Sequence, residues 1–189
     1  MDLMFIEMER LKQVYDSRRE HAERDPAFAS VAIRARVTLL GNVHSQAEAH
    51  GFNFDSDELP EAGGSGAGPL PLDYFLAGFG FCFLSIMART AASLGVELKG
   101  ASFAVRGLLD RRGAYGTPGV YSGFKDIAYE LRLESGEPTE KIWKLVHEVE
   151  HRCPAHATLE KATTLNQRVF LNGNPIEYNP AFIESGTRK

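Results

Sequence analysis

The stretch that most constrains how this chain can fold is its longest run without charge, YFLAGFGFCFLSIMA at residues 74–88. Pro71 and Asp73, just before it, are typical of a helix N-terminus, where proline is tolerated and a carboxylate meets the positive end of the helix dipole. Gly95 is suited to end the helix. We therefore predict a helix over about 71–94. The uncharged run is short for a bilayer span and better suited to a buried helix.

This predicted helix is apolar almost all round, so it should be buried on most sides. In a chain of 189 residues, a helix so enclosed indicates that a second subunit covers part of it.

The other elements are predicted from periodicity and turn residues. Residues 1–25 have helical spacing, and 30–40 alternate as a half-buried strand. A Gly41–Asn42 turn joins this strand to a weaker one over about 44–54. A glycine-rich loop follows, and further strands are expected at 101–110, 127–134 and 163–171, with a flexible turn between the first two and a helix from Pro138 to about Cys153. The order α, ββ, α, ββ, α, β predicts an α+β fold of antiparallel hairpins packed on long helices.

Charge and composition exclude several partners and compartments. The net charge of −4 and the pI near 5.9 give no electrostatic reason to expect nucleic acid or a membrane surface as partner. The start, MDLMFIEMERLKQ, has neither the cationic nor the apolar segment of a signal peptide. We therefore expect a cytoplasmic protein, in which two cysteines are not a structural disulfide framework.

The two cysteines have different surroundings in the sequence. Cys82 comes eleven residues after Pro71 and stands between Phe81 and Phe83. The helix dipole does not reach it there, and burial would raise its pKa, so core packing is the simpler interpretation. Cys153 follows a histidine and an arginine, which favour its thiolate. If the apolar faces of the two helices meet, the thiols come within disulfide range, but the sequence leaves that open.

Metal and cofactor binding are not expected. His147, His151, Cys153 and His156 form H-x3-H-x-C-x2-H, yet Pro154 interrupts the helix within this pattern and no second pair of ligands is evident. The loop GGSGAGP lacks the lysine of a phosphate-binding loop.

Two segments together resemble the OsmC/Ohr family of osmotically inducible protein C and organic hydroperoxide resistance proteins. They are GGSGAGPLPLDYFLAGFGFCFLSIMA and HEVEHRCPAHATL, and the similarity in element order extends over about 30–171. The resemblance implies an OsmC-like domain at 29–171, with a helical extension at 1–28 and an irregular tail at 172–189. It further implies an intertwined homodimer with long central helices at its interface.

The resemblance also implies an activity and a set of site residues. That activity is thiol-dependent reduction of organic hydroperoxides, in which Cys82 is the attacking thiol and Cys153 the resolving thiol. An external dithiol would then reduce the resulting disulfide. Apart from the resemblance, we expect Asp73, close after the helix-opening proline, to help to position an activating group.

The chain departs from the family pattern at two positions, which keeps other functions open. The family's peroxidases have a glutamate directly after the helix-opening proline, where this chain has Leu72, and an arginine near the first hairpin, where LLGNVHSQ has none. One alternative is an OsmC-like protein that binds or transfers small sulfur-containing or apolar ligands. Another is a structural dimer whose core cysteines are inert.

Overall fold

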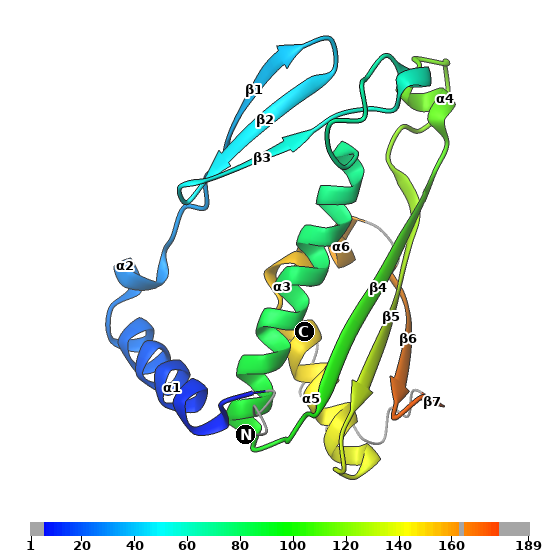
Figure 1. The fold of residues 1–189 in the computed structure, drawn as a ribbon. Coiled ribbons are helices and arrows are strands. Elements are labelled where there is room, and N and C mark those ends of the chain that lie inside the picture. The colour runs from blue at the N-terminus through cyan, green and yellow to red at the C-terminus, as the bar shows by residue number, and fades with distance from the viewer. Residues whose placement is uncertain (1–5, 163–164, 178–189) are drawn as a thin grey trace. The chain divides into compact units, whose positions relative to one another are not determined.

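The computed structural model describes residues 6–162 and 165–177 of the chain (Figure 1). Two compact units make up the fold: residues 1–19 with 79–189 form unit 1, and residues 20–78 form unit 2. The boundaries lie inside helices α1 (Met8–Arg24) and α3 (Pro71–Leu94), so each helix contributes to both units.

Unit 2 contains an antiparallel sheet in the order β1-β2-β3, made of β1 (Arg36–Gly41), β2 (His44–Ala49) and β3 (Phe52–Ser56), after a short helix α2 (Pro26–Ala29). The turn predicted at Gly41–Asn42 is confirmed, with Asn42 in the left-handed region. The single strand predicted over 44–54 is wrong. A second turn divides it, because His50 takes a φ of 51° beside Gly51 at 80°.

The half-buried strand predicted over 30–40 differs from the observed one in length and in burial. The strand begins only at Arg36, and its side chains are exposed along its whole length. Val37 and Leu39 are 66% and 65% exposed. Alternation of apolar and polar residues predicts that one face of β1 is covered, but the single chain leaves this face exposed.

The glycine-rich loop after β3 is held together by one buried carboxylate. Asp57 accepts hydrogen bonds from the backbone N–H groups of Glu58, Ser65 and Ala67, and from the Ser65 hydroxyl, at 2.8–3.1 Å. These bonds hold the pKa of Asp57 well below its usual range. Gly64 is required in this loop, because a Cβ there would lie 1.8 Å from the Glu58 carbonyl oxygen. A single 3-10 turn, Pro60–Ala62, interrupts the otherwise irregular loop.

Helix α3 has the predicted bounds, and Gly95, with a φ of 63°, follows its end. Its residues Phe79, Phe83 and Met87 are buried in unit 1, whereas Phe81 is 74% exposed. The single chain therefore buries one face of the helix and not most sides. By length and composition alone α3 could cross a membrane, a test that the core helix of a soluble protein also passes.

Unit 1 contains the sheet β4-β5-β6-β7, seen in Figure 1 as neighbouring arrows. Its strands are β4 (Gly100–Leu109), β5 (Phe124–Glu134), β6 (Leu165–Leu171) and β7 (Asn174–Ile176). Two pairs are antiparallel as expected, but β5 and β6 are parallel. They are parallel because helices α5 (Thr139–Arg152) and α6 (Pro154–Ala162) form a crossover that returns the chain to the same end of the sheet.

Three smaller differences concern connections in unit 1. The expected flexible turn after β4 contains the short helix α4 (Arg111–Ala114), and β7 lies in the segment expected to be an irregular tail. Helix α6 was not predicted. Thr163 and Thr164, placed in the last predicted strand, lie outside the described residues.

The core of unit 1 lies between its sheet and the helices α3 and α5. Both predicted stripes are buried in this core: Ile127, Tyr129, Leu131 and Leu133 on β5, and Ile142, Leu145, Val146, Val149 and Cys153 on and directly after α5. Cys82 of α3 packs against the same cluster. The apolar faces that carry the two cysteines therefore meet.

Candidate active site

The two cysteines, 71 residues apart in the chain, lie side by side in the core of unit 1. Their Sγ atoms are 3.5 Å apart, and the Cys153 thiol donates a hydrogen bond to the sulfur of Cys82. Cys82 is partly exposed, whereas Cys153 is fully buried, and both thiols are free. A disulfide has an S–S length of about 2.05 Å, so the two sulfurs need only approach by about 1.5 Å to bond.

Cys153 is positioned by two helices at once. Its backbone is extended, with φ −77° and ψ 113°, as expected for a residue before proline. Its N–H donates to the Val149 carbonyl at the end of α5, and its own carbonyl accepts from Ala157 in α6. The residue therefore ends one helix and caps the next, with Pro154 at the first position of α6, which proline favours.

The electrostatic surroundings of Cys153 keep its thiol protonated. Its pKa is raised to about 11, with burial as the largest cause and the neighbouring Cys82 as a further one. The backbone N–H groups of His156 and Ala155 act in the opposite direction, because they donate toward the sulfur from the first turn of α6. Since burial outweighs these donors, Cys153 is a thiol at neutral pH and serves as a hydrogen-bond donor.

An aromatic cluster lies beside the dithiol pair. Phe79, Phe83, Phe103, Tyr129 and His156 pack with ring centroids 4.8–6.3 Å apart. The result is an apolar environment.

One buried polar group stands at the edge of this cluster. The Tyr129 hydroxyl hydrogen-bonds to Glu150 at 2.9 Å and to Gln167 at 2.8 Å. Burial, and then the nearby Glu150 carboxylate, raise the pKa of Tyr129 far above its usual range.

Asp73 is located at the first turn of α3. Its carboxylate accepts a hydrogen bond from the Leu70 backbone N–H at 3.1 Å and so supports the start of the helix. Nine residues separate it from Cys82, which is two and a half turns, or about 13 Å, along one α-helix. Its expected role in positioning an activating group stays a prediction.

The histidines of the H-x3-H-x-C-x2-H pattern are divided by the fold. His147 and His151 lie side by side on α5, with ring centroids 4.3 Å apart and planes tilted by 59°. His156 lies in the aromatic cluster, and Cys153 faces Cys82. Among residues 6–162 and 165–177, no group of three or more potential ligand side chains is placed to hold a metal ion.

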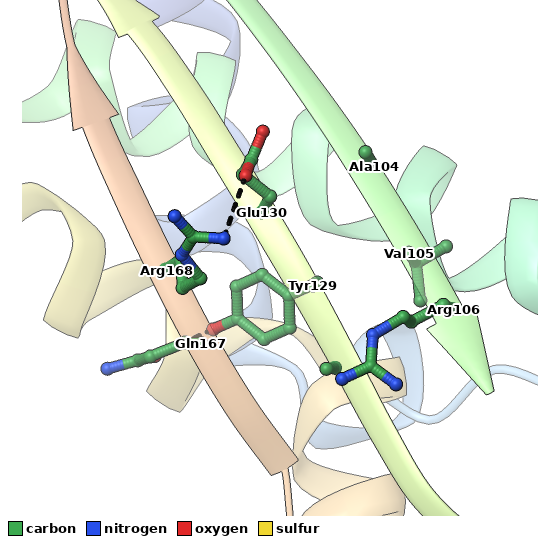
Figure 2. A pocket seen from close by; sticks show the side chains of 8 residues that line it. Ala104, Val105, Arg106, Tyr129, Glu130, Gln167 and Arg168 are labelled. Atoms are coloured by element: carbon green, nitrogen blue, oxygen red, sulfur yellow. Dashed lines mark hydrogen bonds and ion pairs between the residues drawn. The ribbon is translucent and has the colours of Figure 1, made fainter. Parts of the chain in front are cut away.

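A separate hollow of about 340 Å³ lies on the sheet of unit 1 (Figure 2). Its lining includes Ala104, Arg106, Glu130 and Arg168, together with Tyr129 and Gln167. Its cations are paired: Arg168 lies 3.7 Å from Glu130, as the dashed line shows, and Arg106 lies 3.7 Å from a neighbouring aspartate. Because these charges balance, the hollow is a weaker candidate than the dithiol pair.

Sequence reasoning found both thiols but missed the groups around them. Tyr129 and Phe103 were predicted only as strand residues, and nothing in the alternation distinguishes a core tyrosine with polar partners from one without. Helix α6, which begins directly after Cys153, could have been predicted, because proline is common at the first position of a helix.

The fold and the site define an α+β protein with two free, neighbouring cysteines in its core. A scan against family models identifies the particular family: the model for OsmC-like protein matches residues 63–168. This match covers more than half of the chain and includes both cysteines, so the chain belongs to the OsmC-like family. No protein with a curated description matches the sequence.

Solved structures show the same fold at low sequence identity. An OsmC-like protein from Mycoplasma pneumoniae is 22% identical, with a TM-score of 0.67, over 75% of this chain and 98% of its own. An organic hydroperoxide resistance protein OsmC from Legionella pneumophila is also 22% identical, with a TM-score of 0.57, over 74% of this chain and 97% of its own. An organic hydroperoxide resistance protein from Elizabethkingia anophelis is 16% identical, with a TM-score of 0.60, over 76% and 98%. The α+β fold expected from the sequence is confirmed, and the division into 1–28, 29–171 and 172–189 stays a prediction.

Proposed function

We propose that this protein is a thiol peroxidase that reduces organic hydroperoxides in the cytoplasm through Cys82 and Cys153. The observation that carries the proposal is the 3.5 Å approach of a partly exposed thiol to a fully buried one. Relatives of the same fold are described as organic hydroperoxide resistance proteins, which supports this reaction class.

The exposure of the two thiols supports a different role for each. Cys82 is the thiol that a hydroperoxide can reach, so it attacks as the thiolate. Cys153, buried and with a raised pKa, is held as a neutral donor to that sulfur. The hydrogen bond from Cys153 keeps the two sulfurs 3.5 Å apart, the position from which Cys153 can attack oxidised Cys82.

The proposed reaction has three steps. The Cys82 thiolate attacks the terminal oxygen of ROOH and the O–O bond breaks, giving a sulfenic acid and an alkoxide that takes a proton to become the alcohol. The Cys153 sulfur attacks the sulfenic sulfur and water leaves as the disulfide forms. An external dithiol reduces this disulfide and is itself oxidised. Asp73 enters the proposal only as a positioning residue at the start of α3.

A homodimer is part of the proposal. Val37, Leu39, Phe52 and Phe81 are 65–74% exposed in the single chain, which is unusual for large apolar side chains. A second copy that covers them would account for the alternation of the first strand and the apolar character of α3. Sedimentation equilibrium of the full chain tests this directly.

The decisive experiment is the intact mass of fully reduced protein after addition of cumene hydroperoxide, with Cys82→Ser and Cys153→Ser as matched variants. We expect rapid loss of two hydrogens in the wild type, and a sulfenic acid trapped by dimedone in Cys153→Ser. Cys82→Ser should not react.

If the wild type stays reduced in excess hydroperoxide, the peroxidase proposal is wrong. Disulfide formation at an equal rate in the absence of hydroperoxide would also contradict it. Binding of small sulfur-containing ligands by the same fold would then be the function to test.

A further inference from the structure

The dithiol pair offers two sulfur atoms to a ligand as well as to an oxidant. The Sγ atoms of Cys82 and Cys153 lie 3.5 Å apart, and both thiols are free. Cys82 is on α3, and Cys153 lies between α5 and α6. Because helices hold both residues, the distance between the sulfurs is set before any ligand binds, which lowers the cost of bonding to both at once.

This separation distinguishes between the centres that bond to thiolate sulfur. Thiolates select soft centres, and a bond of this kind is about 2.3 Å long. Two such bonds at about a right angle or slightly more, as in a pyramidal three-coordinate centre, hold their sulfurs about 3.3–3.5 Å apart. A linear two-coordinate centre needs about 4.6 Å, and tetrahedral zinc needs about 3.8 Å together with two more ligands. The observed 3.5 Å lies in the range of the pyramidal centre.

We propose that the dithiol pair binds organic trivalent arsenicals, in which arsenic carries one organic group and two hydroxyl groups. Such a pyramidal centre takes two sulfurs from the protein, because its third bond goes to carbon. Two As–O bonds and two S–H bonds break, and two As–S bonds form. Each hydroxyl group leaves as water with one thiol proton, so arsenic stays trivalent and the binding consumes no oxidant or reductant.

Burial gives the two As–S bonds different roles. Arsenic bonds first to Cys82, which is partly exposed, and Cys153 then displaces the second hydroxyl group in an intramolecular step. Cys153 is fully buried, so a competing thiol from solution reaches its bond to arsenic only after a local opening of the core. We therefore expect the arsenical to be released slowly.

This binding does not depend on the proposed peroxidase function. If the chain is a peroxidase, bound arsenic inhibits it, because both sulfurs are occupied. If the chain has another function, the two sulfurs bind the arsenical in the same way.

The test is the intact mass of the fully reduced full chain after addition of phenylarsine oxide and then excess glutathione. We expect one phenylarsenic group per chain, which glutathione does not remove and the dithiol dimercaptopropanol does. Cys82→Ser and Cys153→Ser can form only one As–S bond, so the glutathione concentration that removes half of the arsenic should be at least about 100-fold lower than in the wild type.

A third variant keeps two thiols but changes the distance between them. It combines Cys82→Ser with Ile86→Cys, which moves the thiol one turn along α3, by about 6 Å. Ile86 packs against the same core cluster, and far-UV circular dichroism checks that the variant is folded. We expect this variant to lose arsenic to glutathione as the single-cysteine variants do.

Three results would overturn the proposal. They are loss of arsenic from the wild type as readily as from the single-cysteine variants, retention by the Ile86→Cys variant equal to that of the wild type, and equal protection of both thiols by zinc at the same concentration. A chain that retains arsenic but stays reduced in cumene hydroperoxide would contradict only the proposed function. A chain that reduces cumene hydroperoxide but loses arsenic to glutathione would contradict only this inference.

Discussion

The pH dependence of Cys153 alkylation is the sharpest test of how the dithiol pair is built. In Cys82→Ser, Cys153 is the single remaining thiol of the chain. With Cys82 present, burial as the largest cause raises the pKa of Cys153 from the ordinary value of 9.0 to about 11. The serine removes the part that Cys82 adds, and burial still holds the pKa of Cys153 above 9.0. Since each pKa unit changes the thiolate fraction tenfold, we expect up to about 100-fold less thiolate than in the unfolded chain below pH 9. Full burial adds further protection, because the reagent must wait for a local opening.

The assay is the rate of iodoacetamide labelling of this variant between pH 7 and pH 11.5, followed by mass spectrometry, with the same variant in urea as the control. In the folded protein, the rate should continue to rise beyond pH 10, whereas in urea it should be half-maximal near pH 9 and level off by about pH 10. The same shift makes the reduced fold lose stability as pH rises from about 9 toward 11, because the unfolded thiol ionises first. A folded labelling rate within threefold of the urea control at pH 8 would refute the reasoning.

Two further predictions concern buried polar groups. Tyr129→Phe keeps the ring but removes a hydrogen bond to Glu150. Urea unfolding should therefore show a free energy of unfolding lower by about 1–3 kcal/mol, with an unchanged m-value. A decrease below about 0.5 kcal/mol would mean that water replaces the hydroxyl. Asp57→Asn should lower the urea midpoint at pH 7. Because the folded pKa of Asp57 is lowered, its carboxylate stabilises the fold above about pH 4, and this stabilisation is lost as the pH falls. The difference in stability between wild type and variant should therefore shrink on acidification. A difference that stays constant from pH 7 to pH 3 would contradict this.

Local signals account for the elements that could be predicted. Helix α3 begins at Pro71 and ends before Gly95, because proline and glycine affect the backbone within one helical turn of their own positions. The buried stripe of α5 and the alternation of β5 follow from periods that a single sequence displays. These signals depend on residues that are close in the sequence, so they can be recognised without knowledge of the fold.

Other features depend on contacts that no local pattern records. The turn at His50 needs a non-glycine residue at positive φ, a conformation that short polar residues adopt only occasionally. The exposure of Val37 and Leu39 depends on whether another part of the protein covers β1, and the alternation of residues does not identify that part. The parallel pairing of β5 with β6 depends on α6, which was missed because Pro154 was interpreted as a helix end and not also as a helix start.

The Cys-Pro step explains why a buried thiol with a raised pKa can still be a useful partner. Pro154 forces Cys153 out of helical geometry, and the hydrogen bonds at Val149 and Ala157 then fix its backbone from both sides. The sulfur is therefore held 3.5 Å from Cys82 by two helices rather than by a loop. A resolving thiol does not need to be acidic or exposed, because its target is a sulfenic sulfur already next to it, and proximity of this kind replaces a bimolecular encounter. In the proposed reaction, an oxidant that cannot reach the buried Cys153 therefore reacts first at Cys82.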